Sequence, residues 1–126
     1  MEDKTISGGH FEYKQYTIDD IADSIEDYLY GHDLDDSEVQ DFMNDYYSDE
    51  DMVKYVIEHH HTMPNYLGFR YQTLQQMKRA VKTLRKAAVY AQRIDWLLCG
   101  DDGEDTFIRR LFADLKDVNQ GRKVDY

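Results

Sequence analysis

A long stretch of regularly spaced apolar residues constrains the fold of this chain more than any other feature. Between Thr73 and Leu98, apolar side chains recur at alternating intervals of three and four residues: Leu74, Met77, Val81, Leu84, Ala88 and Ala91. This spacing places them on one side of an α-helix about 39 Å long, at about 1.5 Å of rise per residue. Such a seam packs against helices that run nearly antiparallel to it. The pattern therefore predicts a small bundle around one long central helix.

Four shorter amphipathic stretches predict further helices. Their expected N-terminal residues are polar and suited to capping, in chain order Thr17, Asp36 or Ser37, Ser48, and Asp102. We expect Gly31 to end the first helix and Gly100 to end the long one, and the last helix to run from Glu104 to about Asp117. The predicted fold class is all-α, with about five helices.

The remaining segments lie outside the predicted helices. We expect a flexible arm over residues 1–9, an extended arm from His10 to Tyr16, and a flexible tail over residues 119–126. Residues 31–69 are acidic and rich in tyrosine, and they form an insert-like region. With 126 residues the chain has room for one modest core, so we predict a single helical domain over residues 1–126.

Charge is divided unevenly along the chain. Residues 1–60 hold 18 Asp and Glu against 3 Lys and Arg, whereas residues 61–126 hold 8 against 12. From Arg70 to Arg93 there are seven basic residues and no acidic one. This basic stretch either binds an anion or is neutralised by the acidic half of the same chain, and we favour neutralisation. The net charge of −11 disfavours duplex nucleic acid and anionic membranes and suits a basic partner.

Composition also bears on location. Cys99 is the only cysteine, so the chain cannot form an internal disulfide, and we expect a reducing cytosol. We identify no signal peptide, and no apolar run approaches the roughly 20 residues that a membrane span needs.

No motif for catalysis, cofactor binding or metal binding stands out. Glu58 and the three histidines His59, His60 and His61 are metal-ligand types, but adjacent helical residues point about 100° apart and do not converge on one ion. The acidic run after Gly100 fits helix caps better than a cation site. We therefore predict no catalytic residues, no metal ligands and no cofactor.

Two sets of residues are candidates for binding. If the N-terminal arm folds across the end of the long helix, aromatic and cationic side chains come together there: Phe11, Tyr13, Lys14, Tyr16, Tyr90, Arg93 and Trp96. They would form either a nucleotide-binding site or a polar lid on the core, and we favour the lid. The acidic half supplies a candidate protein-binding surface, formed by carboxylates on helices: Asp19, Asp23, Glu26, Asp27 and Asp45. A solvated helix face is the alternative for this second set.

Two stretches of the sequence carry a resemblance. One is Ser7 to Tyr16 (SGGHFEYKQY), and the other runs from Tyr90 to Leu98 (YAQRIDWLL) and on through Gly100 to Asp105 (GDDGED) and Phe107. Together they resemble an uncharacterised family of small proteins encoded by bacteriophages and prophages. The resemblance implies a viral origin, the cytoplasm of a bacterial host, and action on host machinery or host defence.

Three function hypotheses follow, and none is an enzyme. The first is a non-enzymatic inhibitor that antagonises a host defence or machinery target by protein contact through its acidic half. The second is a sponge that sequesters a small phosphorylated or nucleotide immune signal. The third is a virion or assembly accessory protein. The small residues Ala88 and Ala91 on the long helix also allow a homo-oligomer.

Overall fold

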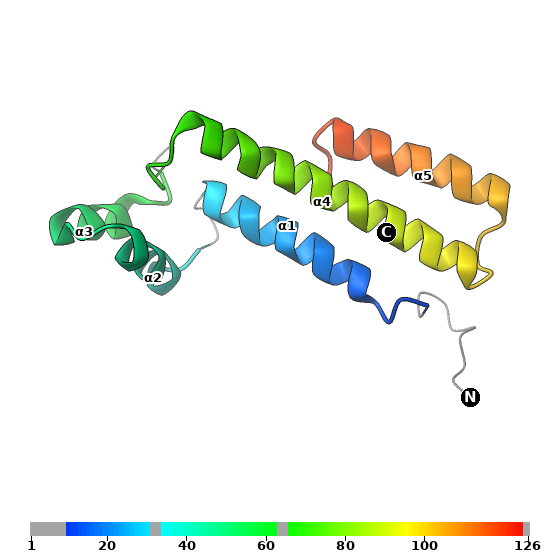
Figure 1. Cartoon of the computed structure of the whole chain (residues 1–126), viewed down its shortest axis with the longest axis horizontal. Helices are drawn as coiled ribbons and strands as arrows, with labels where there is room; N and C mark the ends of the chain where they lie inside the picture. The colour runs from blue at the N-terminus through cyan, green and yellow to red at the C-terminus, as the bar shows by residue number, and fades with distance from the viewer. Residues whose placement is uncertain (1–9, 31–33, 63–65, 125–126) are drawn as a thin grey trace. The chain divides into compact units, whose positions relative to one another are not determined.

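The fold is all-α, as predicted. The computed structural model describes residues 10–30, 34–62 and 66–124, and within these ranges it contains five helices and no strand. The helices, in chain order, are α1 (Lys14–Tyr30), α2 (Asp36–Tyr46), α3 (Glu50–His59), α4 (Tyr71–Leu98) and α5 (Glu104–Asn119) (Figure 1). The long helix α4 has 28 residues and includes the whole of the predicted repeat.

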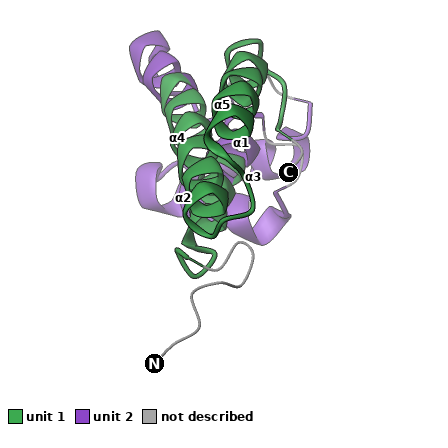
Figure 2. Ribbon diagram, turned by 90° about the vertical axis from the view of Figure 1, so that its right-hand side faces the viewer, with its two compact units in different colours: residues 1–23, 79–126 green, residues 24–78 purple. Residues whose placement is uncertain are grey.

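The contacts within the chain divide it into two compact units (Figure 2). Unit 1 comprises residues 1–23 and 79–126, and unit 2 comprises residues 24–78. The helices α1 and α4 contribute residues to both. The insert-like region 31–69 falls wholly within unit 2. A single domain over the whole chain stays a prediction.

Unit 1 has a small apolar core between α4 and α5, which run antiparallel (Figure 1). Val89 of α4 packs with Leu111 and Val118 of α5, and three partly buried residues complete this cluster: Phe107, Leu115 and Val124. The first part of α1 lies along α4 in the same unit, joined to it by polar contacts.

Gly100 ends α4, as predicted. Its φ of +83° lies in the left-handed region that favours glycine. The N–H of Gly100 donates to the carbonyl of Leu97 at 3.2 Å, and the N–H of Asp101 donates to that of Trp96 at 2.9 Å. This pair of hydrogen bonds is the Schellman pattern, which satisfies the last carbonyls of a helix and reverses the chain toward α5.

Unit 2 has a larger core that is rich in aromatic residues. Its buried members come from α2, α3 and the segment before α4: Leu34, Val39, Met43, Val53, Val56, Tyr66 and Leu67. Tyr47 closes this core by donating its hydroxyl to the carbonyl of Leu67 at 2.5 Å. Gly68, with a φ of +70°, allows the close approach, because a Cβ there would lie 2.8 Å from the Tyr47 oxygen.

The start of α1 differs from the prediction. The helix begins at Lys14 rather than after Thr17, and residues 10–13 form a turn rather than an extended arm. Glu12 and Tyr13 have φ angles of 56° and 62° in the left-handed region. The Thr17 cap was therefore wrong, because Gln15 makes its hydrogen bonds to a distant part of α4 that local sequence does not reveal.

The start of α2 agrees with the prediction, whereas the cap of α3 does not. α2 begins at Asp36, and Asp35 and Glu38 form a capping box before it. α3 is capped by Asp49, which accepts hydrogen bonds from two N–H groups of the first turn, so the predicted cap Ser48 was one residue early. Serine and aspartate are equally good caps, and the backbone decides between neighbours.

The cap of α5 also differs. Gly103 is the N-cap and makes no side-chain hydrogen bond. Asp102, the predicted cap, is buried and accepts a hydrogen bond from Arg110 at 3.1 Å. An ion pair inside unit 1 therefore takes the carboxylate that local sequence assigned to the helix end. The predicted stop of α1 at Gly31 lies outside the described residues.

Among the described residues, no helix combines the length and the apolar composition needed to cross a bilayer.

Candidate functional site

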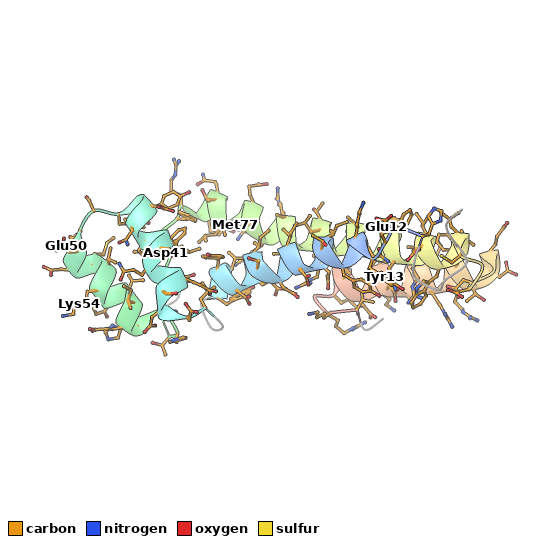
Figure 3. All side chains as sticks on the ribbon, turned by 90° about the horizontal axis from the view of Figure 1, so that it is seen from below. Glu12, Tyr13, Asp41, Glu50, Lys54 and Met77 are labelled. Carbon is orange, nitrogen blue, oxygen red and sulfur yellow. The ribbon has the colours of Figure 1, made fainter. Side chains whose placement is uncertain are left out.

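The turn before α1 folds over the second half of α4 and leaves a hollow beside it. Glu12 and Tyr13 lie at this turn (Figure 3). The hollow has a volume of about 490 Å³ and a mainly apolar lining from the turn, α1 and α4: His10, Phe11, Lys14, Ile18, Ala91 and Ile94. Two of the predicted ligand-binding residues, Phe11 and Lys14, therefore line one hollow.

A buried polar network anchors this turn to α4. Asp95 is fully buried, and its two carboxylate oxygens accept hydrogen bonds from the His10 N–H and the Gln15 amide, each at 2.8 Å. The same Gln15 amide donates to Gln92 at 2.8 Å. Because the acceptors come from residues 77 to 85 positions away, these bonds fix tertiary structure rather than local structure.

Arg93 and Trp96 lie apart from this network. The Arg93 Nε donates to Asp114 of α5 at 2.6 Å, and its guanidinium lies 4.8 Å from the centre of the Trp96 ring. Residues 92 and 93 differ by about 100° around a helix, so one faces α1 and the other faces α5. The structure thus divides the seven predicted ligand-binding residues between two faces of α4.

The other three predicted ligand-binding residues are aromatic and exposed. Tyr13 and Tyr16 have nearly parallel rings with centroids 6.2 Å apart, and the Tyr16 hydroxyl accepts a hydrogen bond from Gln92 at 3.3 Å. Tyr90 is 45% exposed. The residues that sequence reasoning missed are Gln15, Gln92 and Asp95. Their one signal was a pair of polar residues three positions apart within an otherwise apolar helix face.

Two basic residues of α4 in unit 1, Arg85 and Arg93, form ion pairs with carboxylates of the same unit. Arg85 is 11% exposed and donates to Asp19 and to Asp23, each at 2.8 Å. Lys123 also lies 3.3 Å from Asp23. Burial opposes ionisation of Asp23, but the hydrogen bonds from Arg85 and Lys123 hold its pKa below the usual value. The expected neutralisation is therefore confirmed for Arg85, and two predicted partner-binding carboxylates are engaged inside unit 1.

In unit 2, by contrast with the ion pairs of unit 1, many carboxylates are exposed and have no basic partner among the described residues. From residue 35 to residue 58, nine Asp and Glu accompany a single lysine, and all nine carboxylates are exposed: Asp35, Asp36, Glu38, Asp41, Asp45, Asp49, Glu50, Asp51 and Glu58. Within the described part of the chain none of them pairs with Lys or Arg, since the one ion pair there joins Asp36 to His60. We call these nine carboxylates the acidic surface. Asp45 belongs to it, whereas Glu26 and Asp27 are half-buried on α1.

Several of these carboxylates also stabilise helix starts. Asp35 accepts hydrogen bonds from the Glu38 N–H and the Ser37 hydroxyl, each at 2.9 Å, and these hydrogen bonds lower the pKa of Asp35. Asp49 accepts hydrogen bonds from the N–H groups of Asp51 and Met52 at the start of α3. Glu38 completes the capping box of α2, and Asp36, Glu50 and Asp51 lie in first turns, where a negative charge stabilises the helix. The other three, Asp41, Asp45 and Glu58, lie outside the first turns and act as no cap.

A groove between α2 and α3 interrupts the acidic surface. Its volume is about 660 Å³, with Val53 and Ile57 supplying apolar lining and Gln40, Glu50 and Glu58 supplying polar lining. Figure 3 labels Asp41, Glu50 and Lys54 on these two helices. Three large apolar or aromatic side chains are exposed on the same helices: Tyr46 at 64%, Met52 at 36% and Tyr55 at 55%. Exposed aromatic residues and methionine are enriched in protein-binding surfaces, whose rims are polar.

Comparison of the chain with protein-family models, with curated proteins and with solved structures finds no match.

Proposed function

We propose that this chain is a non-enzymatic binding protein whose acidic surface engages a basic partner protein. The single observation that carries the proposal is the nine exposed carboxylates of residues 35–58, none of which pairs with Lys or Arg among the described residues. Together with Lys54 they give this segment a net charge of −8. Mutual repulsion among them opposes folding, and a partner that neutralises them gains that energy on binding.

The aromatic residues on these helices support a protein partner over a simple solvated face. Tyr46, Met52 and Tyr55 supply apolar contact area, and the groove beside Val53 and Ile57 has room for a partner side chain. Charge would then steer the encounter, while the apolar contacts would supply most of the affinity. The negative charge of the acidic surface repels nucleic acid, which favours a protein as the partner.

The resemblance to phage proteins extends the proposal to biology. It suggests a protein made in an infected bacterium, which would place the partner among host defence or host machinery proteins in the cytoplasm. Self-association and a role in the virion are alternatives that the same experiments address.

A nucleotide sponge has less support, because its proposed cation Arg93 donates to Asp114 and is 6% exposed. The hollow beside Phe11 and Lys14 is the one feature in its favour.

The test compares two variants of equal net charge. In the first, three carboxylates of the acidic surface are neutralised as Asp41→Asn, Asp45→Asn and Glu50→Gln. The matched control neutralises three exposed carboxylates of unit 1 as Asp101→Asn, Glu104→Gln and Asp105→Asn. Each full-length protein is incubated with lysate of infected bacteria and analysed by native mass spectrometry.

The proposal expects a protein partner that is retained by wild type and by the control but lost by the first variant. Its affinity should fall as salt is raised. Equal retention by both variants would show that the acidic surface is not the interface. A retained mass of a few hundred daltons would instead favour the sponge.

A further inference from the structure

Three side chains that can bind a metal ion converge where α2 begins and α3 ends. Asp36 is the first residue of α2, His60 follows the last residue of α3, and His61 comes next in the turn. One carboxylate oxygen and one ring nitrogen of each histidine all lie within 4.8 Å of one another. The three residues belong to unit 2.

The two adjacent histidines lie together in the turn after α3. The helix stops at His59, and the N–H of Thr62 donates to the His59 carbonyl at 3.0 Å to form a turn. In this turn the rings of His60 and His61 have centroids 3.8 Å apart and planes 40° apart. The two rings are therefore close together, although the backbone of His60 keeps right-handed helical angles.

One pair of atoms already has the spacing that a tetrahedral ion requires. The His60 Nε2 and the Asp36 Oδ1 are 3.3 Å apart. Bonds of about 2.0–2.2 Å to a tetrahedral zinc ion hold two ligand atoms about 3.3–3.5 Å apart. The same separation allows a weak hydrogen bond in the absence of metal.

The three side chains differ in their freedom to close on an ion. His60 is fully buried, and its ring lies 6.0 Å from that of the buried Tyr66, so surrounding side chains fix its position. Asp36 and His61 are exposed and can rotate. Binding requires the His61 ring to move away from the His60 ring until both nitrogens reach one ion.

The donor set identifies the class of ion. Two imidazole nitrogens and one carboxylate oxygen suit Zn²⁺ and neighbouring divalent transition metals, whereas Ca²⁺ and Mg²⁺ prefer oxygen ligands alone. Three protein ligands leave a fourth position for water. Asp35 is the residue that caps α2, so the Asp36 carboxylate is not required there.

We propose that Asp36, His60 and His61 bind one divalent transition-metal ion, with Zn²⁺ as the best match. The ion joins the first residue of α2 to the turn after α3 and so holds together the two helices that carry the acidic surface. This proposal does not rest on the proposed function.

The test uses the untagged full-length chain, because a histidine tag would bind the same ions. Zn²⁺ affinity is measured by competition with a chromogenic chelator, and Co²⁺ is added separately to record visible absorption. We expect one Zn²⁺ per chain and the intense Co²⁺ bands of tetrahedral coordination. His61→Gln and Asp36→Asn should each weaken Zn²⁺ binding by about ten-fold or more. Loss of a residue that only supports a metal ligand already costs about that much, and these two residues are ligands themselves.

The adjacent His59 provides a matched control. Its ring stacks on Tyr55 with centroids 4.2 Å apart, and its Nδ1 lies 2.8 Å from the Tyr55 carbonyl oxygen, so His59→Gln should bind Zn²⁺ as wild type does. Zn²⁺ should also raise the melting temperature of wild type and His59→Gln but not that of His61→Gln. Absence of saturable binding would overturn the proposal, as would equal loss in His59→Gln and His61→Gln.

Discussion

The two units of this protein differ in whether their charged side chains form ion pairs. Unit 2 holds 12 Asp and Glu against 3 Lys and Arg, and the nine carboxylates of its acidic surface face solvent. Unit 1 holds 14 against 12, and ion pairs such as Arg93 with Asp114 and Arg85 with Asp19 lie inside it. Several charges of unit 1 therefore pair within the fold, whereas the nine carboxylates of unit 2 make no ion pair with Lys or Arg among the described residues. The net charge of −11 conceals this difference.

The cores of the two units also differ, in size and in polarity. The apolar core of unit 1 is small, and buried polar residues such as Asp95 and Gln92 supplement it. The core of unit 2 is larger and apolar, centred on Met43 and Val39. Unit 1 should thus depend on polar pairing for its stability, and unit 2 on packing.

The largest effect is expected when the buried ion pair of unit 1 is broken. Arg93→Ala leaves the Asp114 carboxylate, which is 12% exposed, without its guanidinium partner. Breaking such a buried pair lowers the free energy of unfolding by about 3–5 kcal/mol. Urea unfolding measures the loss.

Arg109→Ala, on an exposed residue of α5, is the control and should stay within about 0.5 kcal/mol of wild type. A double variant, Arg93→Met with Asp114→Leu, should regain much of the lost stability, because no buried charge remains. If Arg93→Ala unfolds at the same urea concentration as wild type, unit 1 does not depend on this pair.

A cavity in the core of unit 2 should have the next largest effect. Met43 is 1% exposed, and Met43→Ala should lower the free energy of unfolding by about 2–5 kcal/mol. Met52→Ala, on a methionine 36% exposed, is the matched control with a much smaller loss. The Met43→Ala loss should be the same at low and high salt, and a strong salt dependence would contradict the contrast between the units.

Asp23 should make a pH-dependent contribution to the stability of unit 1, smaller than the two effects above. Its pKa is lower in the folded chain than the ordinary value of 3.8, so folding favours the carboxylate. The contribution is fully present above the unfolded-state pKa and is lost as pH falls through the lower folded-state pKa. Because this carboxylate is 39% exposed, solvent screening limits the contribution to about 0–1 kcal/mol.

Acid unfolding of Asp23→Asn tests this contribution. The variant should lose part of the pH dependence of stability below about pH 4. The nearby exposed Asp20→Asn is the control. Identical acid profiles for wild type and Asp23→Asn would show that Arg85 and Lys123 do not stabilise this carboxylate.

The smallest effect on stability is expected from the acidic surface. Asp41→Asn with Asp45→Asn removes two exposed carboxylates that make no ion pair with the described residues, so urea unfolding should change by no more than about 0.5 kcal/mol. A loss well beyond that would mean that these carboxylates support the fold of unit 2, and the contrast between the two units would fail.

Local signals predicted much of the fold and little of the site. The apolar repeat of α4 and the glycine at position 100 were sufficient to predict the longest helix and its end, because both depend on backbone neighbours a few residues away. Asp102 and Thr17 had equally good local signals as caps. The structure instead pairs Asp102 with Arg110 and starts α1 before Thr17, where Gln15 bonds to Gln92 of α4. The cluster that we propose as a metal site was missed because Asp36 lies 24 residues from His60 in the chain, and only the tertiary structure brings them together.

The sequence by itself determined the all-α fold class, the long helix α4 and the uneven division of charge, since periodicity and composition are properties of the chain in order. The tertiary structure alone decided which charges are neutralised. It paired Arg93 with Asp114 and Arg85 with Asp19, and it left the carboxylates of α2 and α3 exposed. The physical reason is that an ion pair depends on a distance of a few ångströms between residues far apart in the chain, and packing of the helices sets that distance.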